Sequence, residues 1–216
     1  MTHGLYFRVA YTWAHAIDDG QDALVAGRPV TVQNSYSTSS ERGPSVTDQR
    51  NRLSVSWIAK PRPFGRGKEF LSTIFNNWKI SGVMSYGSGR PTEARVVGDP
   101  NQDANSSNDR LSGYGRNAFL GPDYATLDLR VTRKINLRER YRLELIAESF
   151  NLFNRSNQRL DFTDDGFQNA AGQFVPLDRQ VGGRNYPAYY QQPTNFMRAT
   201  SAYAPRQIQL ALRFVF

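Results

Sequence analysis

The sequence predicts an all-β fold: part of an antiparallel, up-and-down transmembrane β-barrel, with about six strands and long external loops. Segments that alternate apolar and polar residues predict strands that each have one apolar face. The connections between these segments alternate between long and short, as barrel loops and turns do. Mean hydropathy is −0.59, and no run approaches the roughly 18 apolar residues of a spanning helix. A helical membrane protein is therefore excluded, whereas alternating barrel strands keep the average hydropathy low.

Residues 1–216 are expected to form the C-terminal part of one barrel domain, with strands near residues 4–17, 51–60, 76–90, 123–136, 141–154 and 205–216. The first strand shows the pattern, because its alternate positions from Leu5 to Trp13 are apolar and Arg8 lies between them. In the last strand the apolar positions run from Ile208 to Phe216 in the same way. We expect these faces to contact lipid and the opposite faces to line the lumen. The charged residues expected in the lumen are Arg8, Lys79, Asp128, Arg130, Glu144, Glu148 and Arg213.

The connections follow the order long, short, long, short, long. The long ones are expected at residues 18–50, 91–122 and 154–205, and the short ones at 61–68 and 138–140. Loops of thirty to fifty residues are uncommon in compact soluble domains, where the median is about 4–6 residues. If the long loops are external, the final strand runs down to a periplasmic C-terminus, as barrels of this type require.

The tight turn also predicts a register for the two strands that it joins. A turn centred on Glu139 pairs Lys134 with Glu144 and Arg130 with Glu148. Opposite charges that face each other across a strand pair contribute about 0.2–1 kcal/mol each. A shift by one place would instead set two carboxylates against each other, so the first register is favoured.

Two segments carry a family resemblance. The segment Tyr141 to Asn157 contains Phe150-Asn-Leu-Phe-Asn154 and resembles the penultimate strand of TonB-dependent receptors, which precedes their last long external loop. The segment Arg206 to Phe216 resembles their C-terminal strand.

Further segments resemble the Oar-like branch of the same superfamily. They are Tyr11 to Asp18, Thr47 to Leu53, and Asn76 to Gly82 followed by Ser88 to Pro91. Together and in this order, the segments cover most of the chain outside the long loops.

The last strand also resembles the signal read by the outer-membrane assembly machinery. That signal has a polar residue, a small residue, an apolar residue and a final aromatic residue at fixed spacing. Gln209, Ala211, Phe214 and Phe216 occupy these positions, with Ala211 where glycine is usual.

The resemblance implies a receptor for active solute uptake in the bacterial outer membrane. Complete members have about 22 strands around a plugged lumen, together with a TonB-contacting segment and a signal peptide. None of these features is recognisable here, so the chain is expected to be a C-terminal fragment that has no plug domain. The implied partners are outer-membrane lipid, the barrel-assembly machinery, the TonB complex through the missing plug, and an unknown small solute.

One loop has the opening spacing of a calcium site. Oxygen-bearing side chains alternate at Asp99, Asn101, Asp103 and Asn105. The match then fails, because Ala104 occupies the place of the turn glycine and Arg110 that of the bidentate glutamate. Calcium and a solvated turn loop both stay open, and no other cofactor is expected.

No catalytic set is visible, and we expect no enzyme. His3 and His15 are the only histidines, there is no cysteine, and no Gly-x-Ser-x-Gly elbow occurs. His15 lies close in sequence to Asp18 and Asp19, which is compatible with a metal site, a base, or a histidine at the end of a strand. The net charge of +8 comes from scattered basic residues, so no nucleic-acid partner is expected.

Two alternative functions stay open. One is a surface-binding, adhesin-like outer-membrane barrel without transport. The other is a soluble β-sandwich or lipocalin-like binder, in which the apolar faces would form a packed core.

Overall fold

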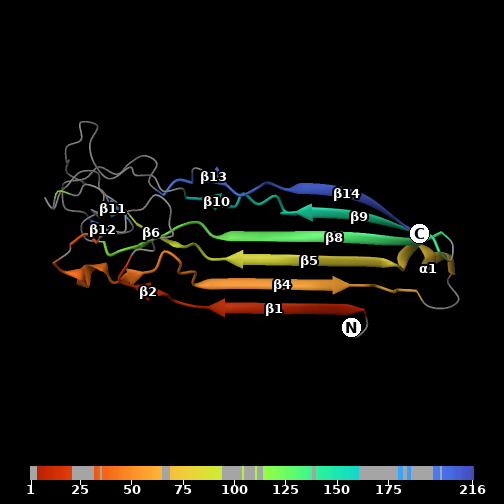
Figure 1. The fold of residues 1–216 in the computed structure, drawn as a ribbon, viewed down its shortest axis with the longest axis horizontal. Coiled ribbons are helices and arrows are strands. Elements are labelled where there is room, and N and C mark those ends of the chain that lie inside the picture. Colours follow the sequence, from red (N-terminus) through yellow and green to blue (C-terminus); the bar gives the residue numbers. More distant parts are fainter. Residues whose placement is uncertain are drawn as a thin grey trace.

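Six long strands form one antiparallel sheet in the order β1-β4-β5-β8-β9-β14 (Figure 1). The computed structural model describes residues 4–20, 32–34, 36–64, 69–93, 104, 110, 114–137, 140–160, 180–181, 184–185, 197–199 and 201–216. The strands are β1 (Leu5–Trp13), β4 (Asn51–Ala59), β5 (Trp78–Gly87), β8 (Tyr124–Asn136), β9 (Arg142–Phe150) and β14 (Gln207–Val215). Each pairs with the long strand that follows it in sequence, which confirms the predicted all-β, up-and-down architecture.

The two ends of the sheet differ. The short elements gather at one end, here called the loop end (Figure 1). They are β2 (Ile17–Asp18), η1 (Thr38–Glu41), β3 (Gly43–Pro44), β6 (Pro91–Thr92), β7 (Phe119–Leu120), β10 (Gln158–Arg159), β11 (Gln180–Val181), β12 (Arg184–Asn185) and β13 (Ser201–Ala202). The opposite end, here called the turn end, holds α1 (Glu69–Phe75) and both chain termini. Among the described residues, no helix is both long and apolar enough to cross a membrane.

The predicted register between β8 and β9 is confirmed. Arg130 is the backbone partner of Glu148 and Lys134 is that of Glu144. Both pairs form ion pairs, at 3.1 Å for Arg130–Glu148 and 3.4 Å for Lys134–Glu144. Arg213 of β14 lies 3.9 Å from the other oxygen of Glu144, so opposite charges meet across three strands of one face.

The register carries the alternation across the whole sheet. On one face, the row through Val9 continues through Val55, Met84 and Leu127. These apolar side chains do not form an enclosed core. On β14, Leu210 keeps 80% of its surface exposed, and large apolar side chains on β1 are also exposed.

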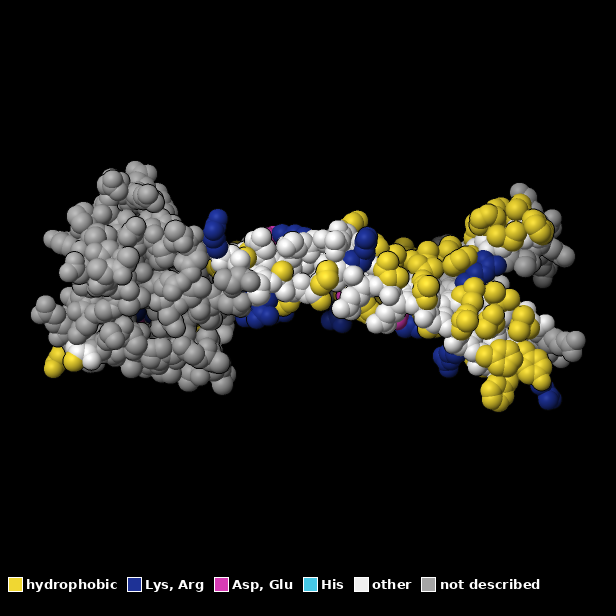
Figure 2. All heavy atoms as spheres, turned by 90° about the horizontal axis from the view of Figure 1, so that it is seen from above, with side chains coloured by type: hydrophobic (Ala, Val, Ile, Leu, Met, Phe, Trp, Pro, Cys, Tyr) yellow, Lys and Arg dark blue, Asp and Glu magenta, His cyan; other side chains and the backbone are white. Residues whose placement is uncertain are grey.

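The largest fully buried side chains in the described part of the chain are instead Arg116, Glu41 and Asn157, each less than 2% exposed. In the space-filling view, hydrophobic side chains gather toward the turn end (Figure 2). An exposed apolar face combined with polar burial in the loops is typical of a barrel wall in lipid and not of a soluble sandwich.

One charged residue departs from the expected separation of the faces. Arg133 shares the apolar face with Val131, since alternate residues of a strand point to the same side. Its guanidinium stacks 4.8 Å from the centre of the Trp78 ring and donates a hydrogen bond to the carbonyl of Ile74 at the end of α1. A stacked, hydrogen-bonded arginine at the end of a strand keeps its aliphatic stem on apolar surface and its charge satisfied.

Gly82 is required by the close approach of an aromatic ring. It is the cross-strand partner of Trp57, and a Cβ atom at Gly82 would lie 2.2 Å from the Cζ2 atom of that ring. The indole therefore covers the glycine and fills the space that a side chain would occupy, as aromatic residues do beside glycines in sheets.

We expect Gly82→Ala to weaken the sheet, because the new methyl group forces the Trp57 ring out of its position. The cost should be about 1–3 kcal/mol, as for other overpacked sites. Thermal unfolding of the protein in detergent, followed by heat-modifiable gel mobility, measures it. Gly115→Ala is the matched control, since a Cβ atom there would meet nothing within 4 Å. Equal stability of the two variants would contradict the assigned role of Gly82.

Candidate functional site

The loop end is held together by a buried ion pair between two long connections. Glu41, at the end of η1, accepts two hydrogen bonds from Arg110, at 2.7 Å from Nη1 and 2.8 Å from Nη2. The Nε atom of Arg110 also lies 3.6 Å from a carboxylate oxygen of Glu93. The 14–50 connection and the 88–123 connection are thereby joined through a bidentate arginine–carboxylate pair, the strongest common geometry for such ions.

Arg116 fastens the same two connections through the backbone. Its Nε donates to the carbonyl of Glu41 at 2.7 Å, and its two terminal nitrogens donate to the carbonyls of Gly20 and Asp18 at 2.6 and 2.8 Å. It also forms an ion pair with the Asp18 carboxylate. The next residue, Asn117, donates to the carbonyl of Pro44 at 2.7 Å. A fully buried guanidinium thus satisfies three backbone carbonyls of the 14–50 connection.

The electrostatics favour the charged form of Glu41. Burial by itself would raise the pKa of the Glu41 carboxyl, but the hydrogen bonds from Arg110 and from the Gln33 N–H, with the charge of Arg110, hold it below its usual value. Burial by itself would lower the pKa of the Arg110 guanidinium, but its hydrogen bonds to the Glu41 carboxylate and the charge of that carboxylate raise it. Both groups are therefore ionised at neutral pH, and the pair persists there.

A second polar cluster follows the end of β1. The carboxylate of Asp48 accepts the Ala16 N–H at 2.9 Å and lies 3.1 Å from Nδ1 of His15, while Arg50 lies 2.9 Å from the same nitrogen. Burial opposes ionisation of Asp48, but these contacts outweigh it and lower its pKa.

The partner of His15 is therefore Asp48 and not the Asp18 or Asp19 suggested by the sequence. Among the residues that the structure describes, no three His, Cys, Asp or Glu side chains gather as a metal site.

The asparagines in the segment after β9 have structural roles. Asn151 and Asn154 have φ angles of 49° and 51°, in the left-handed region that asparagine tolerates better than most residues. The backbone N–H of Asn151 donates to the Asp128 carboxylate at 2.9 Å, which ties the turn to β8. The side chain of Asn154 accepts the Arg206 N–H at 3.0 Å, which ties the turn to the start of β14. The Phe150–Asn154 motif therefore holds three strands in place at the loop end.

Asn157 extends this junction between β8, β9 and β14. Its amide donates to the carbonyl of Ala125 and accepts the Ala125 N–H, both at 2.9 Å. The side chain thus replaces a backbone partner at the edge of β8. Arg155 donates to the same oxygen of Asn157 at 3.1 Å and forms a 2.8 Å ion pair with Asp123.

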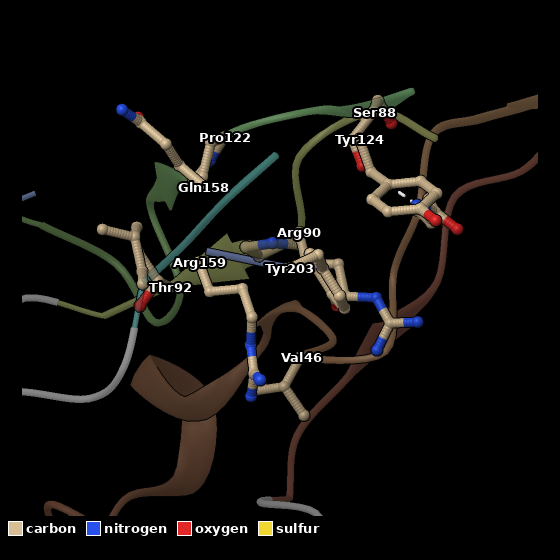
Figure 3. Close-up of a pocket in the computed structure, with 13 residues that line it drawn as sticks. Val46, Ser88, Arg90, Thr92, Pro122, Tyr124, Gln158, Arg159 and Tyr203 are labelled. Atoms are coloured by element: carbon tan, nitrogen blue, oxygen red, sulfur yellow. Dashed lines mark hydrogen bonds between the residues drawn. The ribbon is translucent and has the colours of Figure 1, made fainter. Parts of the chain in front are cut away.

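A cavity of about 490 Å³ lies at the loop end, where these connections converge (Figure 3). Described residues that line it come from three connections and the start of β8 and are Val46, Gln49, Ser88, Arg90, Pro91, Thr92, Gly121, Pro122, Tyr124, Gln158, Arg159, Leu160 and Tyr203. Its size lies within the usual range of about 300–1,000 Å³ for small-molecule sites. It is the candidate functional site.

The possible calcium ligands and the assembly-signal residues predicted from the sequence do not appear among the described residues that line this cavity. The possible calcium ligands Asp99, Asn101, Asp103 and Asn105 lie outside the described residues. Arg110, which occupies the place of the bidentate glutamate in that pattern, lies among the described residues and pairs with Glu41. Of the assembly-signal residues, Gln209, Ala211 and Phe214 lie in β14 and Phe216 directly follows it.

Sequence reasoning assigned no site role to the residues that hold and line the cavity, although Ser88 to Pro91 lie in a segment that carries the family resemblance. Glu41 and Arg110 are 69 positions apart, and nothing local to either one signals the other. The sequence alone assigned no role to the lining aromatic residue Tyr203. The Phe150–Asn154 motif was recognisable, although the hydrogen bonds of its asparagines were not.

Comparison with known proteins gives one family. The family model of the outer membrane beta barrel domain matches residues 1–113 and 99–209. No curated protein and no solved structure matches the chain.

We expect Arg110→Met to loosen the loop end without unfolding the sheet, because the substitution strands the buried Glu41 carboxylate. Breaking one partner of a buried pair costs about 3–5 kcal/mol. Limited proteolysis of the folded protein should then cut the 14–50 connection faster. The double variant Glu41→Leu/Arg110→Met should regain much of the protection, since it leaves no unpaired charge at Glu41.

Arg42→Met is the control for this comparison. Arg42 is exposed and adjacent to Glu41. Its substitution removes the same charge from the 14–50 connection, whose cutting is measured, without touching the pair. Equal cutting of the Arg42 and Arg110 variants would contradict a specific role for Arg110.

Proposed function

This chain belongs to the outer membrane beta barrel domain family and lies in the bacterial outer membrane, and we propose that it forms wall strands and external loops of a TonB-dependent receptor for active solute uptake. The family sets aside a soluble β-sandwich or lipocalin-like binder. The observation that carries the finer proposal is the Phe150–Asn154 motif. It resembles the end of the penultimate receptor strand, and it joins β8, β9 and β14 where the last long loop begins.

The sheet edges support a larger barrel around this chain. β1 and β14 are the outer strands of the six-stranded sheet. An unpaired strand edge is not tolerated in the hydrocarbon of a membrane, because its N–H and C=O groups have no partners there. The smallest single-chain membrane barrels have about eight strands. The proposed receptor therefore supplies further strands beside β1 and β14.

Each surface of the chain has a role in this receptor. The apolar face contacts outer-membrane lipid, and the charged face borders the lumen that holds the plug. The plug, outside this chain, contacts the TonB complex, and movement of the plug admits the solute. At β14, Gln209, Ala211, Phe214 and Phe216 present the assembly signal to the barrel-assembly machinery. We assign the chain no catalytic role and no nucleic-acid partner.

We expect the loop end to face the cell exterior. The chain has no cysteine, so single-cysteine labelling is free of background from this segment. Tyr36→Cys, at a fully exposed position of the loop end, should react with a membrane-impermeant maleimide on intact cells. Arg140→Cys, exposed at the turn end, should react only after the outer membrane is permeabilised. The reverse result would contradict the proposed orientation.

Transport requires a plug and an inner-membrane partner, and we expect both. The native protein, isolated from outer membranes with an antibody against this chain, should carry a plug domain on the N-terminal side of the barrel. In cells, that domain should crosslink to a TonB-type protein. Cells without the TonB-type protein provide the control for the crosslinked band.

A native protein that has no plug and forms no such crosslink would overturn the transport proposal. It would favour the adhesin-like barrel, which needs strands and external loops only.

A further inference from the structure

We propose that the loop-end cavity binds an organic oxyanion, a solute with a carboxylate or phosphate group attached to a flat, apolar body. The inference rests on the proposed receptor function only for the fate of the solute, since binding needs no energy coupling. Three features of the cavity support it: the sign of its charge, its aromatic lining, and the rigidity of its walls.

The charge of the lining is positive. Arg90 and Arg159 contribute guanidinium groups, and no carboxylate occurs among the described lining residues. The neighbouring Asp123 is already paired with Arg155 at 2.8 Å. Within the described part of the chain, the Arg90 side chain has no hydrogen bond or ion pair, although its backbone carbonyl accepts the Gly121 N–H at 2.9 Å. Guanidinium groups bind carboxylates and phosphates in planar, bidentate geometry.

The aromatic lining fits a flat body beside the anion. Tyr124 and Tyr203 meet edge to face, with ring centres 5.0 Å apart and planes at 71°. Arg159 lies over the Tyr203 ring, 5.2 Å from its centre. In Figure 3, Tyr203 is drawn between Arg159 and Arg90. A ligand whose ring packs on the tyrosines therefore has a cation within reach of its charged end.

Polar lining groups add directional contacts. Gln49, Gln158, Ser88 and Thr92 provide amides and hydroxyls, while Leu160 adds apolar surface. An apolar wall with a few convergent polar groups is the usual composition of a small-molecule site.

The walls are held by contacts that do not involve a ligand. The Tyr203 N–H donates to the carbonyl of Asn157 at 2.9 Å, so the aromatic ring stands on the Asn157 junction described above. Gln49 donates to the Ser88 carbonyl at 3.1 Å. Gly89 approaches Gly121 so closely that a Cβ atom on Gly89 would overlap the Gly121 carbonyl oxygen. A site built on such contacts loses little entropy when a ligand binds.

The test uses two probes of nearly equal shape and different charge. The full-length protein that carries this chain is purified in detergent and titrated with 2-naphthoate and with its neutral analogue 2-naphthamide, with binding followed by calorimetry. 2-Naphthyl phosphate distinguishes a preference for phosphate from one for carboxylate. We expect either anion to bind at least about tenfold more tightly than the amide, because charge-assisted hydrogen bonds to arginine are lost with the neutral probe.

Substitutions assign the effect to this cavity. Arg90→Gln and Arg159→Gln should each weaken anion binding about tenfold and leave amide binding nearly unchanged. Arg42→Gln removes the same charge at the loop end away from the cavity lining and should change binding less than twofold. Tyr203→Leu should weaken all the probes alike, whereas Tyr203→Phe keeps the ring and should not.

Equal affinity of the unsubstituted protein for naphthoate and naphthamide, or no binding of any probe, would overturn the inference. This outcome does not depend on whether a variant folds. Unchanged anion binding in both arginine variants would also overturn the inference. Anion binding by a protein that has no TonB contact would leave this inference standing and overturn transport. TonB contact without any preference for anions would leave the transport proposal standing and overturn this inference.

Discussion

The fold depends on the need to pair every backbone N–H and C=O group of a strand that crosses lipid. Hydrocarbon offers no partners, so the antiparallel ladder has to continue from strand to strand. In this chain it runs without a break from β1 to β14. Side-chain alternation follows from the same ladder, because a shift of one residue would exchange the two faces of a strand. The rows of apolar and charged residues are consequences of this pairing and do not compete with it.

At the loop end, backbone N–H and C=O groups also need partners, but strand pairing does not provide all of them. The connections leave the ladder, so their carbonyls and amides need other partners, and the apolar residues are already committed to the lipid face. Buried polar side chains provide the partners. Arg116 collects three loop carbonyls, and Asn157 takes the place of a strand edge at Ala125. Isolated charges could not be buried there, and so Arg110 and Glu41 enter as a hydrogen-bonded pair.

This contrast explains how much the sequence could predict. The strand faces and the β8–β9 register depend on residues that are close in sequence, such as Lys134 and Glu144, and both were predictable from alternation and charge. The loop-end contacts join residues such as Glu41 and Arg110, whose proximity arises only after the strands have aligned their connections. Alternation alone places Arg133 on the apolar face, but the contacts with Trp78 and the end of α1 that satisfy its charge there were not predictable. The candidate calcium residues stay a sequence prediction.

The buried loop contacts also determine what the cavity can do. A receptor loop that orders itself only when a ligand arrives spends part of the binding energy on that ordering. Here the Asn157 junction positions Tyr203, and the Gly89–Gly121 approach fixes the segment that carries Arg90. The cations are therefore presented by supported walls instead of by free loop tips. This arrangement favours selection by charge, since a neutral ligand in a cavity lined by guanidinium groups forgoes the charge-assisted hydrogen bonds that an anion gains there.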